Sequence, residues 1–185
     1  MIALIMGLIY GLGGYTQNHE NIIWGDRVID WKDFKGQADS KSPYKAITYT
    51  EFGQFLDFDK DTLTIRITAE FVPTKSWVKE EKSDYLLKHE QIHFDIVEYV
   101  ARLYRKAVLD HHFESYDEII PTITGLFKHF SQKRKKLQDD YDLDTDHSRF
   151  KPIQNKWNRE IEELLIANKD YAATTYKIYI GYLKE

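Results

Sequence analysis

Two histidines and a glutamate stand at a spacing that suits a metal ion and the activation of water. They are His89, Glu90 and His93, in the run His89-Glu90-Gln91-Ile92-His93. On a helix, residues four apart lie on one face, so both imidazoles can reach the same ion. Glu90 stands about 100° further round the helix, within reach of a water at that ion. The pattern predicts a zinc site with Glu90 as general base.

The surrounding stretch favours a helix. Residues 85–103 are rich in apolar residues and contain no Pro or Gly, and Ser83 and Asp84 are suitable N-cap residues. The alternative is an amphipathic helix whose histidines merely face solvent or a neighbour. We prefer the metal site because the two histidines have the spacing of metal ligands and the glutamate occupies the position of the general base in the same motif.

Composition limits the classes of protein to consider. The chain has 185 residues, 42% of them hydrophobic and 30% charged, which is typical of one folded domain. A net charge of -4 argues against a nucleic-acid partner. With no cysteine present, a metal site must use His, Asp or Glu.

The N-terminus is apolar. Residues 1–14 are uncharged and end in Gly13-Gly14, and polar residues follow. This resembles the apolar region of a secretory signal, although the usual positive residues at its start are missing. The run is too short to span a bilayer comfortably, so we expect no stable membrane span. We predict a signal-like segment over 1–18, one domain over 19–185, and export to the periplasm, cell surface or medium; the alternative is a buried first strand or helix.

Strand patterns precede the motif helix and helical patterns follow it. Residues 28–31 suggest a short strand, 46–52 another and 54–61 a turn, whereas 62–71 alternate polar and apolar strictly and form the clearest strand. After the motif, helical patterns occupy about 119–130 and 152–165, with an acidic stretch at 137–146 between them. Residues 176–182 fit either a strand or a helix. We predict an α+β fold with a small antiparallel sheet, the metal-binding helix, and two or three further helices.

The residues alone leave the third metal ligand open. Ile96 and Tyr99 stand where a metzincin has Gly and His, which excludes that class. Asp95 and Glu98 face away from His93 on the helix, and Glu98 is better placed to pair with Arg102. The candidates are acidic residues and four later histidines: His111, His112, His129 and His147. His147 lies between two helical patterns, where a turn could return to the metal or simply be a charged surface turn.

Several stretches together resemble a bacterial family known as domain of unknown function 922. The resemblance covers about 24–168, and its most specific part is His89-Glu90-Gln91-Ile92-His93-Phe94-Asp95-Ile96. The matching stretches are 31–36, 76–78, 86–96, 101–102, 141–147 and 154–157. That family looks like exported zincin-type metallopeptidases. Its Thr-x-His pattern falls on Thr145 and His147, which implies His147 as third ligand. One departure is Ser148, where the family pattern has Gly.

The function predicted is zinc-dependent hydrolysis of a peptide or protein substrate. His89, His93 and His147 hold one zinc ion, and Glu90 is the general base. Tyr141 is a candidate oxyanion donor, although a packed tyrosine is the better interpretation. Residues 62–71, as an edge strand, would hold an extended peptide. Two alternatives remain open: a metal- or partner-binding protein on a zincin scaffold without turnover, and an exported interaction domain whose histidines are incidental.

Overall fold

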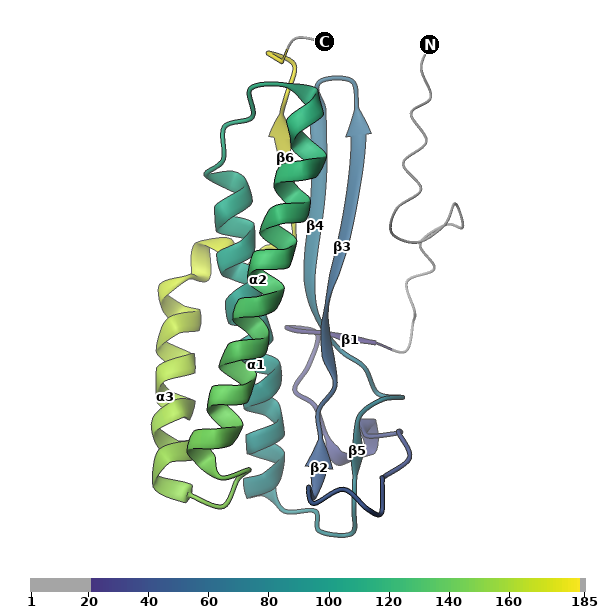
Figure 1. The fold of residues 1–185 in the computed structure, drawn as a ribbon, viewed down its shortest axis with the longest axis vertical. Coiled ribbons are helices and arrows are strands. Elements are labelled where there is room, and N and C mark those ends of the chain that lie inside the picture. The colour runs from purple at the N-terminus through teal and green to yellow at the C-terminus, as the bar shows by residue number, and fades with distance from the viewer. Residues whose placement is uncertain (1–20, 184–185) are drawn as a thin grey trace.

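The computed structural model describes residues 21–183 and has an α+β fold (Figure 1). The predicted signal-like segment 1–18 lies outside the described residues. The strands are β1 (Ile22–Ile23), β2 (Ala46–Ile47), β3 (Thr50–Asp59), β4 (Thr62–Phe71), β5 (Trp77–Val78) and β6 (Thr175–Tyr179). The helices are α1 (Asp84–Leu109), α2 (Tyr116–Thr145) and α3 (Lys151–Ala167), with short 3-10 turns at Trp31–Asp33 and Lys169–Tyr171.

The clearest predicted strand is confirmed as β4, but it lies inside the sheet, with partner strands on both edges. It pairs antiparallel with β3 along its whole length, with β6 from Thr62 to Arg66, and with β1 at Glu70 and Phe71. The prediction that it is an edge strand was therefore wrong. Strict alternation shows that one face of a strand is buried, but it does not show what pairs with its edges. Of those partners, β3 directly precedes β4, whereas β1 and β6 come from opposite ends of the described residues.

One further strand prediction and one turn prediction were wrong. The predicted strand at 28–31 is a loop that ends in the Trp31–Asp33 turn, held by the bidentate pair between Arg27 and Asp33 at 2.6 and 2.7 Å. The predicted turn at 54–61 is mostly strand, because β3 continues to Asp59 and the chain reverses at Lys60. Within the predicted strand 46–52, the chain leaves a small sheet of β2 and β5 and enters β3.

Helix α1 lies between the sheet and the other two helices, and it contacts β4, α2 and α3 (Figure 1). Its N-terminus is capped as predicted, since the Ser83 side chain accepts a hydrogen bond from the Leu86 N–H. Apolar residues of α1 pack on the inward face of β4 and against α2, forming the main core. Buried members of this core include Leu63, Ile65, Ile67, Phe94, Val97, Val100, Tyr104 and Ile123.

A buried ionic cluster fixes α1 against the sheet. Glu98 accepts hydrogen bonds from Arg102, as predicted, and also from Arg105. Arg105, only 1% exposed, donates further bonds to the Ile67 and Tyr171 carbonyls. Each charge is thus both paired and hydrogen-bonded, which is the condition under which buried ions are tolerated. The cluster holds the motif helix in register with β4 and the C-terminal segment.

Helix α2 is longer than its apolar pattern indicates. It starts at Tyr116, so Pro121 lies in its second turn, and it continues to Thr145 through the acidic stretch. Lys135 with Asp139 and Lys136 with Asp140 make ion pairs one turn apart along this stretch. The extension carries Asp142 on a helix that crosses α1. No helix in the described part of the chain is long and apolar enough to cross a membrane.

Candidate metal centre

The histidines of the α1 motif lie together in the interior, as the sequence predicts. His89 and His93 are 3% and 8% exposed, and their ring centroids are 4.9 Å apart. Both rings contact Tyr141 of α2, which stacks on His89 and meets His93 edge-on. The spacing of four on a helix, with α2 packed behind it, therefore brings the two imidazoles to one point.

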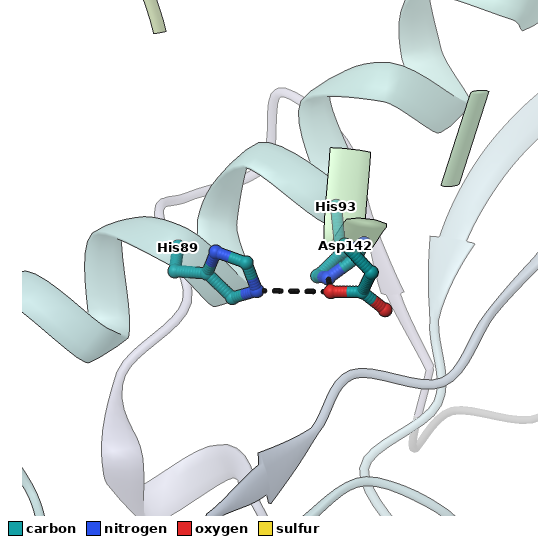
Figure 2. Close-up of side chains that lie close together, drawn as sticks. All are labelled: His89, His93 and Asp142. Carbon is teal, nitrogen blue, oxygen red and sulfur yellow. Dashed lines mark hydrogen bonds and ion pairs between the residues drawn. The ribbon is translucent and has the colours of Figure 1, made fainter. Parts of the chain in front are cut away.

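A carboxylate from α2 completes the group. Asp142 Oδ1 lies 3.2 Å from His89 Nε2 and 3.1 Å from His93 Nε2 (Figure 2). Of the His, Asp, Glu and Cys residues in 21–183, only these three bring ligand atoms within 4.8 Å of one another in a set that could hold a metal ion.

Glutamine side chains orient both imidazoles. Gln154 Oε1 lies 3.2 Å from His89 Nδ1, and Gln138 Oε1 makes a short contact with His93 Nδ1. The amide nitrogens of these glutamines donate to the carbonyls of Tyr85 and His93, so their oxygens must face the rings. An amide oxygen can only accept, so each Nδ1 carries a hydrogen and each Nε2 of a neutral ring carries a lone pair.

The three converging acceptor atoms therefore favour a bound cation. Two Nε2 lone pairs and a carboxylate oxygen point at one another, an arrangement that a metal ion or a proton must bridge. The pKa of His93 reflects this: burial lowers it, but the hydrogen bond and charge of Asp142 and the charge of Glu90 outweigh burial and raise it. Burial likewise raises the pKa of Asp142, yet the two histidines hold it well below its usual value.

The spacing of the ligand atoms fits a tetrahedral ion. Zinc–nitrogen and zinc–oxygen bonds of about 2.0–2.1 Å place two ligands of a tetrahedron about 3.3 Å apart. The separations of His89 Nε2 and His93 Nε2 from Asp142 Oδ1, 3.2 and 3.1 Å, match that length. His89, His93 and Asp142 could thus hold a metal ion with the side chains where they are.

Glu90 lies beside this group with its carboxylate free. It is 3% exposed and lines the same cleft as the two histidines. No described residue donates a hydrogen bond or forms an ion pair with it. A buried carboxylate left without a partner next to a metal-binding group is suited to accept a proton from water.

His147 lies next to the group but outside it. Its Nδ1 is 3.4 Å from Asp142 Oδ1, on a half-exposed ring that contacts the ring of Tyr44. It is not among the atoms that converge within 4.8 Å. His147 as third ligand thus stays a prediction, and the structure brings Asp142 to that place instead. His111, His112 and His129 take no part in the group.

Tyr141 is not among the residues that line the cleft. The residue is completely buried, and its hydroxyl lies 3.5 Å from the His89 carbonyl oxygen, to which it can donate. Burial, with the charges of Glu90 and Asp142, raises its pKa far above the usual value. These contacts are those of the packed tyrosine that we preferred from the sequence, and a role of Tyr141 as oxyanion donor stays a prediction.

Asp95 fixes the motif helix from the other side. Its Oδ1 accepts hydrogen bonds of 2.8 Å from Trp24 Nε1 and from Gln91 Nε2. Gln91 also accepts the backbone N–H of Ile29. Burial raises the pKa of Asp95 above its usual value. The Gln91 and Asp95 side chains of the motif therefore anchor the N-terminal loop to α1, away from the metal-binding face.

A cleft of about 390 Å³ opens over the metal-binding group. One wall is the segment 44–50, which contains β2, and the other is made by α1 and α2. His89, Glu90, His93, Asp142 and His147 all line it. The candidate ligands and the candidate base thus open to one shared space large enough for part of a peptide.

Three residues of the site were not assigned a role from the sequence: Asp142, Gln138 and Gln154. Asp142 was treated as part of an acidic stretch, yet it follows Gln138 by one helical turn. Gln154 stood in the resemblance without a role. The packing of α2 and α3 on α1 brings these residues to the histidines, although they are 45 to 65 positions apart in the sequence.

Comparisons with protein-family models, curated proteins and solved structures found no match for this chain. The resemblance to domain of unknown function 922, and with it the zincin relationship, therefore stays a prediction that rests on the motifs. The site itself is a His-His-Asp group that could hold a metal ion, and the buried Glu90 lies beside it.

Proposed function

We propose that this chain is a zinc-dependent peptidase. The observation that carries the proposal is the convergence of His89 Nε2, His93 Nε2 and Asp142 Oδ1, each ring being oriented by a glutamine. Two histidines and one carboxylate are a common protein ligand set for catalytic zinc, with the remaining position left to water or substrate.

Each residue has a defined task in this proposal. His89, His93 and Asp142 would hold a zinc ion, which would activate a water and polarise the substrate carbonyl as a Lewis acid. Glu90 accepts the proton of the attacking water and passes it to the leaving amine. Gln138 and Gln154 keep the Nδ1–H tautomer of the histidines, so that both Nε2 atoms stay free to coordinate.

The wall of the cleft supports a peptide as substrate. Lys79 N–H donates to the Lys45 carbonyl across the β2–β5 pair. Because hydrogen-bonded and non-bonded residues alternate in an antiparallel pair, the backbone groups of Ala46 and Thr48 point to the opposite side from β5. Within residues 21–183 no strand pairs with that edge, so it can receive an extended peptide by strand addition. β2 thus takes the peptide-binding role predicted for residues 62–71.

Glu90→Gln tests the proposal. The zinc-loaded variant should bind as much zinc as the wild type but lose hydrolysis of a mixed peptide library by at least about 100-fold, because general base catalysis contributes about 10²–10⁴-fold. Glu162→Gln, on the exposed side of α3, is the matched control and should keep full activity. Undiminished hydrolysis by Glu90→Gln would end the assignment of Glu90. A zinc-loaded wild type without any hydrolysis would favour the binding-protein alternative.

A further inference from the structure

Arg134 of α2 lies in the same cleft, away from the metal-binding group. It is on the face of α2 that also carries Gln138 and Asp142, and all three line the cleft. Eight residues separate Arg134 from Asp142, which corresponds to about 12 Å along a helix. An extended peptide advances about 3.3 Å per residue, so Arg134 stands three to four residues from a peptide bond at the metal.

The Arg134 guanidinium is held in position by contacts with β3, but most of its N–H donors make no hydrogen bond to a described residue. Its Nη1 donates to the Thr50 carbonyl at 2.5 Å, and its carbon lies 5.3 Å from the centroid of the Phe52 ring. Its Nε is buried without a partner, and Nη2 makes no hydrogen bond to any described residue. Nε and Nη2 form the edge of a guanidinium that pairs side-on with a carboxylate.

No carboxylate among residues 21–183 pairs with this edge. The other cations lining the cleft are paired, Lys45 with Glu81 at 2.7 Å and Lys135 with Asp139 at 2.5 Å. Glu51 is the acidic group whose charge acts on Arg134, but it makes no ion pair with it. Side chains alternate along β3, so Glu51 faces away from the side where Phe52 meets Tyr104 and Arg134.

Partial burial of the Arg134 guanidinium makes the lack of an anionic partner unfavourable. It lowers the pKa of Arg134 by more than the charges of Tyr49 and Glu51 raise it. A half-buried guanidinium normally has an anion to compensate for lost hydration. In the described part of the chain, Arg134 is the cation of the cleft that lacks one.

We propose that Arg134 is a specificity-determining residue that binds a carboxylate of the substrate peptide, three to four residues from the bond that is cleaved. This inference rests on the proposed function for its position relative to a scissile bond. The carboxylate belongs either to an acidic side chain or to a free C-terminus. Both present the same carboxylate oxygens to Nη2, the nitrogen of this edge that is not buried.

The test measures binding separately from turnover. Zinc-loaded Glu90→Gln protein is titrated with fluorescent hexapeptides that carry a single Asp or Asn at each position, each made with a free or an amidated C-terminus. One carboxylate position should bind about 10- to 100-fold tighter than its neutral counterpart. An effect that follows Asp identifies a side chain, and one that follows the free end identifies the C-terminus.

Substitutions assign the preference to Arg134. In the same background, Arg134→Gln should abolish the preference, Arg134→Lys should retain only a small part of it because lysine lacks the fork, and neighbouring exposed Lys133→Gln should leave it intact. Matching thermal unfolding of the variants excludes loss of fold as the cause. Absence of any carboxylate preference, or a preference that survives Arg134→Gln, would overturn the inference.

Failure of this inference can be told apart from failure of the proposed function. Wild-type hydrolysis without a carboxylate preference would refute the role of Arg134 and keep the peptidase. An Arg134-dependent preference in binding, in a protein whose wild type hydrolyses nothing, would keep the subsite and refute the peptidase.

Discussion

Asp142 on α2 lies between the two histidines of the α1 motif, with Oδ1 3.2 Å from His89 Nε2 and 3.1 Å from His93 Nε2. The two helices meet at this carboxylate, so the packing of α2 on α1 also completes the candidate metal centre. The motif by itself supplies two candidate ligands and a base, and the third candidate ligand comes from a helix about 50 residues later.

The first prediction separates Asp142 from His147 as ligand. Asp142→Ala should weaken zinc binding by more than about 100-fold, because it removes a ligand, whereas even changes behind a ligand cost about 10–100-fold. His147→Ala should weaken it by less than about 10-fold. Competition with a chromophoric chelator measures both. The reverse order of effects would restore His147 as the third ligand and remove Asp142.

The glutamines behind the histidines give a second prediction. Gln154→Leu removes the acceptor of the His89 Nδ1–H and should weaken zinc binding by about 10- to 100-fold. Gln132→Leu, an exposed change on α2, serves as control. Equal zinc affinity in the Gln154→Leu variant, with its fold intact, would show that this side chain does not orient the ring.

The turn after α2 leads to a third prediction, about stability. Asp146, His147 and Ser148 have φ values of +47°, +50° and +70°, a left-handed conformation that costs a residue with a side chain about 1–2 kcal/mol. Ser148 is also where the resembling family pattern has Gly. Ser148→Gly should therefore stabilise the protein by about 0.5–1 kcal/mol, after the greater freedom of glycine in the unfolded chain is subtracted.

Urea unfolding measures the effect of Ser148→Gly. Ser131→Gly within α2 is the matched control and should destabilise by about 0.5–1 kcal/mol, because glycine is unfavourable inside a helix. If both substitutions destabilise, the left-handed geometry at Ser148 carries no strain that glycine relieves.

A fourth prediction concerns pH and the N-terminal loop. Burial raises the pKa of Asp33, but hydrogen bonds from Arg27 and from the Asp30 N–H outweigh it and leave the pKa below its usual value. The folded state thus favours the carboxylate. Its stabilisation is present above the unfolded pKa of about 3.9 and is lost as pH falls through the lower folded pKa.

Asp33→Asn should therefore destabilise the protein at pH 6, and the difference from wild type should shrink below about pH 4. Unfolding by urea across this range measures it, with exposed Asp170→Asn as control. A difference that stays constant down to pH 2 would show that Asp33 acts through shape and not through charge.

The local parts of the fold and site were predictable, and the parts made by long-range packing were not. The α1 helix, its Ser83 cap and the Glu98–Arg102 pair follow from residues a few positions apart. The place of β4 in the sheet depends on β1 and β6, which come from opposite ends of the chain. Asp142 was missed for a related reason, because charges on an exposed helix face and a ligand on its buried face look alike in a sequence.

The most direct test of the central claim is anomalous diffraction at the zinc edge from a crystal of the zinc-loaded protein. We expect one strong peak with His89, His93 and Asp142 as its protein ligands, and Glu90 beside it without coordination. A peak held by other residues, or no bound zinc in protein that diffracts well, would contradict the proposed centre.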